Sequence, residues 1–468
     1  MCGGVAWIVT FRLTAPENRY RKVVEKRSRN GRRVIDMTSA SSSLTTIRCL
    51  GIPTRLGPAV TQLRKGASTA ALLAVAMLVA LPVQRTSFGQ QSPNHGAPVR
   101  SSHLQVQKSN VIVGFEWIGD QFEYPAPGPG EDTSGLGPIA SWYGKVGYQT
   151  HGDTFPMTWA DDGEIYTSAG DPSWGGKDDG LDVEKLSGAP PYYKIARVNP
   201  MADYKGFGGK GTKPAGMISV NGVLYLAFQN LLGEKPPAHG TKSQHGSDAT
   251  IVSSRDHGKT WTPAIREIKK PMFPGNTFGG PAFVNNGRDN ADAPDNYVYA
   301  VSTDQWDNGS KLRVCRVPAD RIQDVSAWEW VSDLKDYDHP HWSSNLQQAT
   351  PVLTDDRHIS LPDMVYIASI KRYVLLTWRL YKDFSPDKGT ELMIYDAPHP
   401  WGPFTLVHRD AIWESLDMNP YCPRLPLKWL TVNGDELVGW IQFSGSWRPN
   451  SLHYRSHVRQ FRMKVSTQ

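Results

Sequence analysis

Apolar residues along most of this chain occur in short runs separated by turn residues, and few stretches show helical spacing. The stretch from Gly152 to Asp171 (GDTFPMTWADDGEIYTSAGD) has an apolar run on each side of Asp161-Asp162-Gly163, which is the pattern of a β-hairpin. The pattern therefore predicts a chain of repeated hairpins, because four further segments share its order of proline, apolar strand, turn and apolar strand: residues 214–230, 281–304, 362–379 and 426–445.

The spacing of these hairpins predicts the architecture. The prolines that open them are 58, 67, 81 and 64 residues apart. Further strand candidates lie between the hairpins, so each repeat holds about four short strands, the content of one propeller blade. A β-sandwich gives no reason for such a repeat, and β-helix repeats are much shorter. We expect an all-β fold, a five-bladed β-propeller over residues 109–468 with six blades as the second choice, after an N-terminal signal region.

One turn motif supports a propeller. Ser254 to Trp261 (SRDHGKTW) fits the pattern S-x-D-x-G-x-T-W and resembles the Asp box of sialidases and related propellers. In those families the Asp side chain bonds the amides of a structural turn between two outer strands of a blade, and the Trp packs between sheets. The resemblance implies a fold rather than a chemistry, so Asp256 and His257 are not expected to be catalytic.

The net charge of +6 comes from the N-terminal part of the chain. Residues 1–89 contain 14 Lys and Arg against 3 Asp and Glu, whereas residues 90–468 contain 37 basic and 42 acidic groups. A basic leader followed by a slightly acidic domain gives no basis for nucleic-acid binding by that domain.

The leader has the features of a signal peptide at residues 63–89. A positive segment (Leu63 to Gly66) precedes fourteen apolar residues (Ala70 to Val83), and Ser87-Phe88-Gly89 supplies small residues for cleavage. The alternative is a membrane anchor, although a span needs about 20 residues. Residues 90–108 are then a linker, and residues 1–62 are a leader of doubtful translation start. We expect a secreted or periplasmic protein without membrane attachment after cleavage.

Cysteine usage indicates neither a disulfide scaffold nor a zinc site. Only Cys315 and Cys422 lie beyond the leader, and they could form one bridge or remain as two buried thiols. No cluster has metal-ligand spacing, so no metal or other cofactor is expected. A propeller channel can hold a structural calcium ion, but no residue set here requires one. The expected oligomeric state is a monomer.

The first hairpin carries a candidate catalytic pair. Asp153 and Asp171 are equidistant from the turn, so they should face each other across the two strands, near the mouth of the central channel. Two carboxyl groups at such an opening suit glycoside hydrolysis, in which one stays ionised and the other donates a proton. The alternative is that both cap strand ends, as Asp often does.

The same hairpin resembles a family of exported bacterial propellers that was first described as a domain of unknown function and that includes endo-D-arabinanases acting on mycobacterial arabinan. The resemblance covers most of residues 109–445. It implies that Asp153 is the nucleophile and Asp171 the general acid/base. Phe155 and Pro172 depart from the family pattern beside this site, which leaves the sugar open. Besides Gly152 to Asp171, the matching stretches are 281–290, 295–302, 371–378, 391–404 and 425–434.

The repeat also places candidate substrate-binding residues. The second strands of the hairpins should end around one mouth of the channel, where polar groups can bind sugar hydroxyls and tryptophans can stack on sugar rings; packing between blades is the alternative for each Trp. The candidates are Trp174, Asn230, Asp304, Trp378 and Arg379. We expect an exported glycoside hydrolase that cleaves an arabinan-like or other polysaccharide, with a non-catalytic carbohydrate-binding propeller as the alternative.

Overall fold

The computed structural model describes residues 8–12, 21–27, 33–39, 106–123, 152–174, 177–178, 181–204, 212–233, 246–380, 389–410, 413, 419–445 and 454–467. The expected signal peptide and most of the expected linker lie outside these residues. The chain divides into two units, Met1–Pro98 and Val99–Gln468. Among the described residues, no helix has the length and apolar character needed to cross a membrane.

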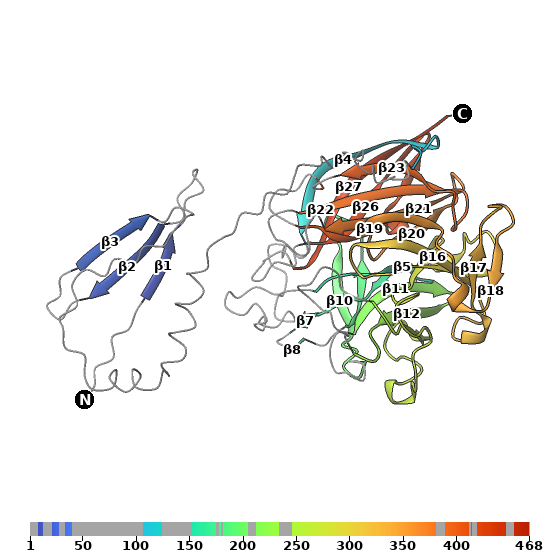
Figure 1. The fold of residues 1–468 in the computed structure, drawn as a ribbon, viewed down its shortest axis with the longest axis horizontal. Coiled ribbons are helices and arrows are strands. Elements are labelled where there is room, and N and C mark those ends of the chain that lie inside the picture. Colours follow the sequence, from blue (N-terminus) through green and yellow to red (C-terminus); the bar gives the residue numbers. More distant parts are fainter. Residues whose placement is uncertain are drawn as a thin grey trace, which may run out of the picture. The chain divides into compact units, whose positions relative to one another are not determined.

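The first unit contains one small antiparallel sheet, in the order β1-β2-β3 (Figure 1). Its strands are β1 (Ile8–Arg12), β2 (Arg21–Arg27) and β3 (Arg33–Ser39).

The second unit is built almost entirely from β-strands, as the sequence predicts. Its regular structure otherwise consists, in the described part, of three-residue 3-10 helices between strands. These are η2 (Ile265–Glu267), η3 (Arg288–Asn290), η4 (Val325–Ala327), η5 (Leu346–Gln348) and η6 (Leu427–Trp429).

The first and second sheets contain the first two predicted hairpins. The first sheet has the order β10-β9-β6-β5 and the second the order β11-β12-β13. Their strands are β5 (Met157–Trp159), β6 (Ile165–Thr167), β9 (Val183–Ser187), β10 (Lys194–Asn199), β11 (Lys213–Val220), β12 (Val223–Gln229) and β13 (Thr250–Ser254). A two-stranded sheet of β7 (Ser173–Trp174) and β8 (Lys177–Asp178) follows the first hairpin.

The third and fourth sheets contain the next two predicted hairpins, and a short parallel pairing of β14 with β20 joins them into one larger sheet. The third comprises β14 (Ala282–Asn285), β15 (Tyr297–Thr303), β16 (Gly309–Pro318), β17 (Glu329–Asp333), β18 (His341–Ser343) and β19 (Leu353–Ile359), which pairs with β16. The fourth comprises β20 (Asp363–Ile367), β21 (Arg372–Leu380), β22 (Thr390–Ala397) and β23 (Thr405–Asp410).

The fifth sheet joins the two ends of the second unit. It has the order β24-β26-β27-β4, with β25 also paired to β26. The fifth predicted hairpin corresponds to β25 and β26, but β24, which precedes that hairpin, is the strand at the end of the sheet. The strands are β4 (Ile112–Glu123), β24 (Tyr421–Arg424), β25 (Thr431–Asn433), β26 (Glu436–Ser444) and β27 (Ser456–Val465). β4 pairs along most of its length with β27.

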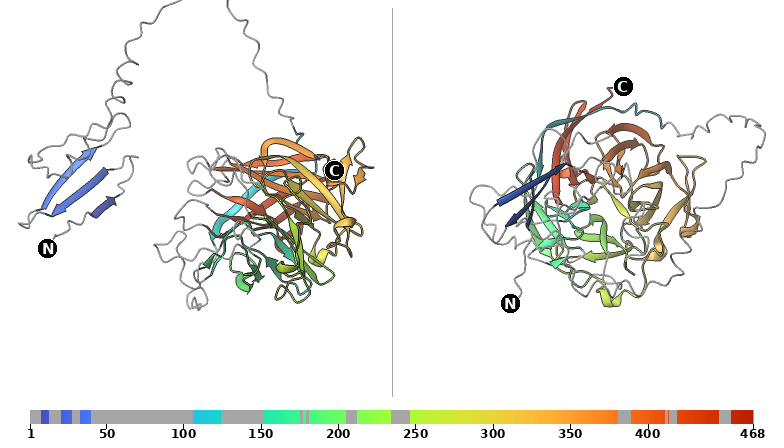
Figure 2. Two further views of the ribbon diagram at one scale, coloured as in Figure 1. Left: turned by 60° about the horizontal axis from the view of Figure 1, so that its bottom comes forward. Right: turned by 60° about the vertical axis from the view of Figure 1, so that its left-hand side comes forward.

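Five apolar clusters hold these sheets together in cyclic order. Residues of consecutive sheets meet in four of them, as Leu181 of the first sheet's region meets Met217 of the second. The fifth cluster combines Met157 and Ile165 of the first sheet with Val458 of the last. Burial of apolar surface on both faces of each sheet therefore closes the arrangement into a ring, and the sheets lie around a common centre (Figure 2).

The described cysteines, Cys315 and Cys422, are buried free thiols. Of the two alternatives that the sequence leaves open, the structure has the one without a bridge. Burial raises the pKa of both thiols, so both behave as small apolar core residues.

Candidate active site

The first hairpin changes register before it reaches the two predicted catalytic aspartates. Met157 pairs with Thr167 and Trp159 with Ile165, but Asp153 forms its bridge with Gly170 rather than with Asp171. The chain around this bridge leaves the extended conformation, because three residues have positive φ: Thr154 (67°), Phe155 (43°) and Asp171 (49°). The expected direct pairing of the two aspartates is therefore wrong by one residue, although both still lie at the same end of the hairpin.

Asp153 is held in a buried position. Asp153 is 6% exposed. Tyr421 Oη donates a hydrogen bond to Asp153 Oδ2 at 2.9 Å. The other oxygen, Oδ1, is buried without a hydrogen-bond donor among the described residues. One oxygen of this carboxyl is therefore fixed by Tyr421.

Asp171 is more accessible and lies in a cationic environment. Its side chain is 35% exposed and forms an ion pair with Lys213 Nζ. Tyr454 Oη donates to Asp171 Oδ2 at 3.2 Å. Lys213 is the first residue of β11, the strand of the second sheet that contacts β5 and β14 of the neighbouring sheets and is called its inner strand below. This ion pair therefore links two neighbouring sheets at the end of the first hairpin.

The two carboxyls influence each other through this shared environment. Burial raises the pKa of Asp153 from 3.8 to about 6. The positive charge of Lys213 opposes this rise, the negative charge of Asp171 adds to it, and the hydroxyls of Tyr421 and Tyr454 lower the pKa of Asp153. Lys213 and Tyr454 thus act on both carboxyls, which lie close enough together to interact.

The backbone next to Asp153 is fixed by two residues of the fifth sheet. The amide of Thr154 donates to Ser444 Oγ at 2.9 Å, and the carbonyl of Thr154 accepts a bond from Nε of the buried Arg424 at 2.9 Å. Gly170 leaves the space that the carboxyl needs, because a Cβ there would lie 2.6 Å from Asp153 Oδ1. A rigid scaffold therefore presents this carboxyl.

Two other predicted substrate-binding residues have structural partners instead. Asn230, at the end of β12, is buried and its Oδ1 accepts a bond from the Ser247 amide at 3.2 Å. Asp304, after β15, accepts bonds from the amides of Ser310 and Lys311 at 2.9 and 3.2 Å. Asp304 thus closes the turn between β15 and β16, which is a common role of Asp at strand ends, and Asn230 joins the end of β12 to the segment before β13.

Trp378 packs in the core between the fourth and fifth sheets. It is 0% exposed, and its ring contacts those of Trp306 and Tyr421, each with centroids 5.5 Å apart. The expected stacking of Trp378 on a sugar ring does not agree with this burial, and the alternative of packing between sheets does. Trp174 lies in β7, but its side chain is outside the described part of the structure.

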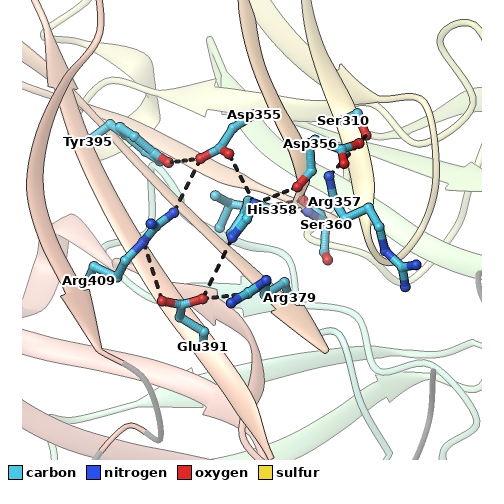
Figure 3. Close-up of polar contacts among 11 residues, drawn as sticks. Ser310, Asp355, Asp356, Arg357, His358, Ser360, Arg379, Glu391, Tyr395 and Arg409 are labelled. Atoms are coloured by element: carbon cyan, nitrogen blue, oxygen red, sulfur yellow. Dashed lines mark hydrogen bonds and ion pairs between the residues drawn. The ribbon is translucent and has the colours of Figure 1, made fainter. Parts of the chain in front are cut away.

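Arg379 belongs to a dense ionic network that joins the third and fourth sheets (Figure 3). It pairs with the buried Glu391, which Arg409 Nε also approaches at 3.3 Å. Arg409 Nη2 reaches Asp355 Oδ2 at 3.3 Å, and His358 Nδ1 lies 3.0 Å from Asp355 Oδ1. Because Glu391 already neutralises Arg379, the expected role of Arg379 in substrate binding has no support from this geometry.

A separate cavity lies where the inner strands of several sheets converge. Met157, Asn285, Asp363 and Arg424 are among its lining residues, and it contains neither Asp153 nor Asp171. Arg424 Nη1 and Asp363 Oδ1 are 3.9 Å apart there, and burial raises the pKa of Asp363. This cavity therefore lies apart from the two predicted catalytic aspartates.

Three neighbours of the aspartate pair were not predicted from the sequence: Lys213, Tyr421 and Tyr454. Lys213 and Tyr421 are the first residues of the inner strands β11 and β24. Inner strands begin at the same end of the ring at which second strands finish. In the sequence, the first residues of the inner strands therefore indicate the residues around Asp153 better than the last residues of the second strands do.

Comparison with known families places the chain. Residues 138–409 match the model of a family described as a domain of unknown function (DUF4185). The chain belongs to this family. The DUF4185 match spans the first four sheets, including Asp153, Asp171 and Lys213, and ends before the fifth sheet with Tyr421 and Tyr454. No curated protein matches the chain.

Solved structures that resemble this DUF4185 protein are remote in sequence. The catalytic domain of a GH62 α-L-arabinofuranosidase from Coprinopsis cinerea is 12% identical, with 71% of this chain and 95% of that chain covered and a TM-score of 0.40. An α-L-arabinanase from Cellvibrio cellulosa is 10% identical, with 67% of this chain and 92% of that chain covered and a TM-score of 0.40. A sialidase from Trypanosoma rangeli is 11% identical, with 70% of this chain and 47% of that chain covered and a TM-score of 0.35. These scores are too low to decide fold details or activity, which depend on the residues described above.

Proposed function

We propose that this protein is an exported glycoside hydrolase that cleaves a glycan with Asp153 and Asp171. The observation that supports this most strongly is the convergence of the two carboxyls on Lys213 and Tyr454, with one carboxyl buried and the other accessible. Two carboxyls in unequal environments are what glycoside hydrolysis requires. The chain supplies both from one hairpin.

The surroundings of Asp153 fit a nucleophile. Tyr421 donates to Oδ2 and so orients the carboxyl, which in this proposal attacks the anomeric carbon. Although burial raises its pKa to about 6, Asp153 is mostly ionised at neutral pH. Its fixed backbone limits the motion that would misalign the attack.

The surroundings of Asp171 fit the general acid/base. Its greater exposure allows it to reach the glycosidic oxygen and then a water molecule. In this mechanism Asp171 must separate from Lys213 and carry a proton before it can protonate the glycosidic oxygen, because a carboxylate has no proton to donate. A covalent intermediate on Asp153 would give a product that retains the anomeric configuration.

The fold that carries this pair is, in our proposal, a five-bladed β-propeller, each of the five sheets being one blade. The cyclic order of the apolar clusters supports it, since they connect consecutive sheets and return from the last to the first. Export depends on the signal peptide expected at residues 63–89. The resemblance of the first hairpin to arabinan-cleaving propellers makes an arabinan-like polysaccharide the first substrate to test.

Incubation with a panel of arabinans, galactans and other polysaccharides tests this function, with released sugars separated by chromatography. Asp153→Asn and Asp171→Asn should each abolish product release, while Asp120→Asn, an exposed position in β4, should leave it unchanged. Affinity for the polysaccharide should persist in both inactive variants. Binding without cleavage by the wild-type chain would instead indicate a non-catalytic carbohydrate-binding protein. Cleavage that survives both substitutions would refute the assignment of the pair.

A further inference from the structure

Three metal-ligating side chains from two sheets meet at the closed end of the first hairpin. One ligand atom from each of Asp161, Asp162 and His257 lies within 4.8 Å of the other two, and His257 Nε2 is 2.8 Å from Asp161 Oδ1. The aspartates belong to the turn between β5 and β6, whereas His257 lies in the turn that follows β13. Spacing along the sequence hides this group, because its members belong to different repeats.

One tyrosine orients two of the three ligands. The ring of Tyr166 stacks on that of His257 with centroids 5.8 Å apart and an interplanar angle of 18°. The hydroxyl of the same tyrosine donates to Asp162 Oδ2 at 2.8 Å, and the amide of Glu164 donates to Asp162 Oδ1 at 3.0 Å. Outer contacts of this kind fix ligand orientation at metal sites and strengthen binding there.

The donor set selects a class of ion. One imidazole nitrogen and two carboxylate oxygens suit Zn²⁺ and chemically similar divalent ions, whereas Ca²⁺ takes six to eight oxygen ligands. The side chains of Asp161 and His257 are 40% and 37% exposed, so an ion and its remaining water ligands have access. We propose that Asp161, Asp162 and His257 form a binding site for Zn²⁺ or a similar divalent ion.

A neighbouring cation sets the strength of the site. Arg288 donates from Nη2 to the main-chain oxygen of Asp161, which places a guanidinium charge beside the proposed ion. Like charge weakens cation binding. The site should therefore bind more weakly than a closed structural zinc site, and Arg288→Gln should bind the ion more tightly than the wild-type chain.

An ion at this site would stabilise the folded protein by linking two sheets. A bound ion would join the first sheet to the second at the hairpin end opposite to Asp153 and Asp171. Occupancy should raise the thermal stability of the protein, because an ion that binds only the folded chain shifts the unfolding equilibrium. This inference does not depend on the proposed hydrolase activity.

Isothermal titration of the full chain without a histidine tag, using ZnCl₂ as the probe, tests the site. We expect one Zn²⁺ per chain, loss of this binding in His257→Ala and Asp162→Asn, and about 10–100-fold weaker binding in Tyr166→Phe, which loses only the hydroxyl contact. His339→Ala is the matched control, because His339 also pairs with an aspartate, Asp336, in an exposed position but belongs to no group of three ligands among the described residues.

Thermal unfolding with and without Zn²⁺ gives a second readout that does not require the substituted chains to match the wild type in stability. Zn²⁺ should raise the Tm of the wild type and of His339→Ala, and leave that of His257→Ala unchanged. Absence of Zn²⁺ binding by the wild type at millimolar concentration would overturn the proposal. So would binding that His257→Ala and Asp162→Asn retain in full.

Discussion

Replacing Asp153 by asparagine should stabilise the folded protein at neutral pH. Burial raises the pKa of Asp153 from 3.8 to about 6, so the folded state holds its proton more tightly than the unfolded state. Stability from this group is fully present below pH 3.8, falls as pH rises between 3.8 and about 6, and is constant above that range. At 1.36 kcal/mol per pKa unit, the ionised carboxyl costs about 3 kcal/mol at pH 7. An asparagine of the same shape removes this cost.

The effect is large enough to measure by calorimetry. The roughly 370 residues of the unit Val99–Gln468 have an unfolding entropy of about 0.8 kcal/mol/K, at about 2.1 cal/mol/K per residue. A change of about 3 kcal/mol therefore corresponds to a rise in Tm of about 4 °C at pH 7, and to no rise below pH 4. Scans of the wild type, Asp153→Asn and the exposed control Asp120→Asn should be made from pH 3.5 to pH 7.5.

The dependence on pH is the decisive part of this result. If the Tm difference between Asp153→Asn and the wild type is the same at pH 4 and pH 7, burial does not raise the pKa of Asp153 as described. If Asp153→Asn is the less stable chain at pH 7, the contacts with Lys213 and Tyr421 outweigh the cost of burial, and the reasoning is refuted. Loss of catalysis together with gained stability would show that the site is strained for function.

Three further substitutions test the surroundings of the pair. Gly170→Ala should cost about 1–3 kcal/mol and lower kcat in a hydrolysis assay, since the new methyl group would lie 2.6 Å from Asp153 Oδ1; unchanged stability and rate would contradict the close packing. Trp378→Ala should lower the free energy of unfolding in urea by about 3–5 kcal/mol without weakening polysaccharide binding by the chains that remain folded; selective loss of binding would return this Trp to the substrate site. Tyr421→Phe removes a hydrogen bond to a charged group, worth about 1.5–3 kcal/mol, so the acidic limb of the pH–rate profile should move up by about 1–2 pH units; an unmoved limb would exclude Asp153 as its source.

The hairpins were predictable because each carries its own local signal. Asn221-Gly222 closes β11 and β12 as the turn chemistry indicates. The strand Tyr421–Arg424 was missed because it has only four residues, one of which is a proline, a pattern that argues against a sheet strand. The strand β4 was also missed, because its partner β27 lies at the other end of the domain and no local pattern reports such pairing.

The candidate site was only half predictable for the same reason. Asp153 and Asp171 share a hairpin, so counting from the turn brought them to one end, and only the positive φ values around them changed the pairing. Lys213 and Tyr421 come from other sheets, and their approach depends on how the sheets close. The error at Trp378 is of another kind. The repeat predicts correctly that Trp378 lies near the end of a strand, but it does not predict that the ring points into the core.

The pairing of β4 with β27 makes completion of the ring a late event in synthesis. Ile112–Glu123 leaves the ribosome long before Ser456–Val465, so its edge has no partner while more than three hundred residues are made. A chain that ends before Ser456 lacks the strand that joins the fifth sheet to β4, and two sheet edges then remain open to association with other chains. Truncation of the chain before Ser456 should thus be as harmful as truncation near the middle of the second unit, because β27 is the strand that holds β4 in the fifth sheet.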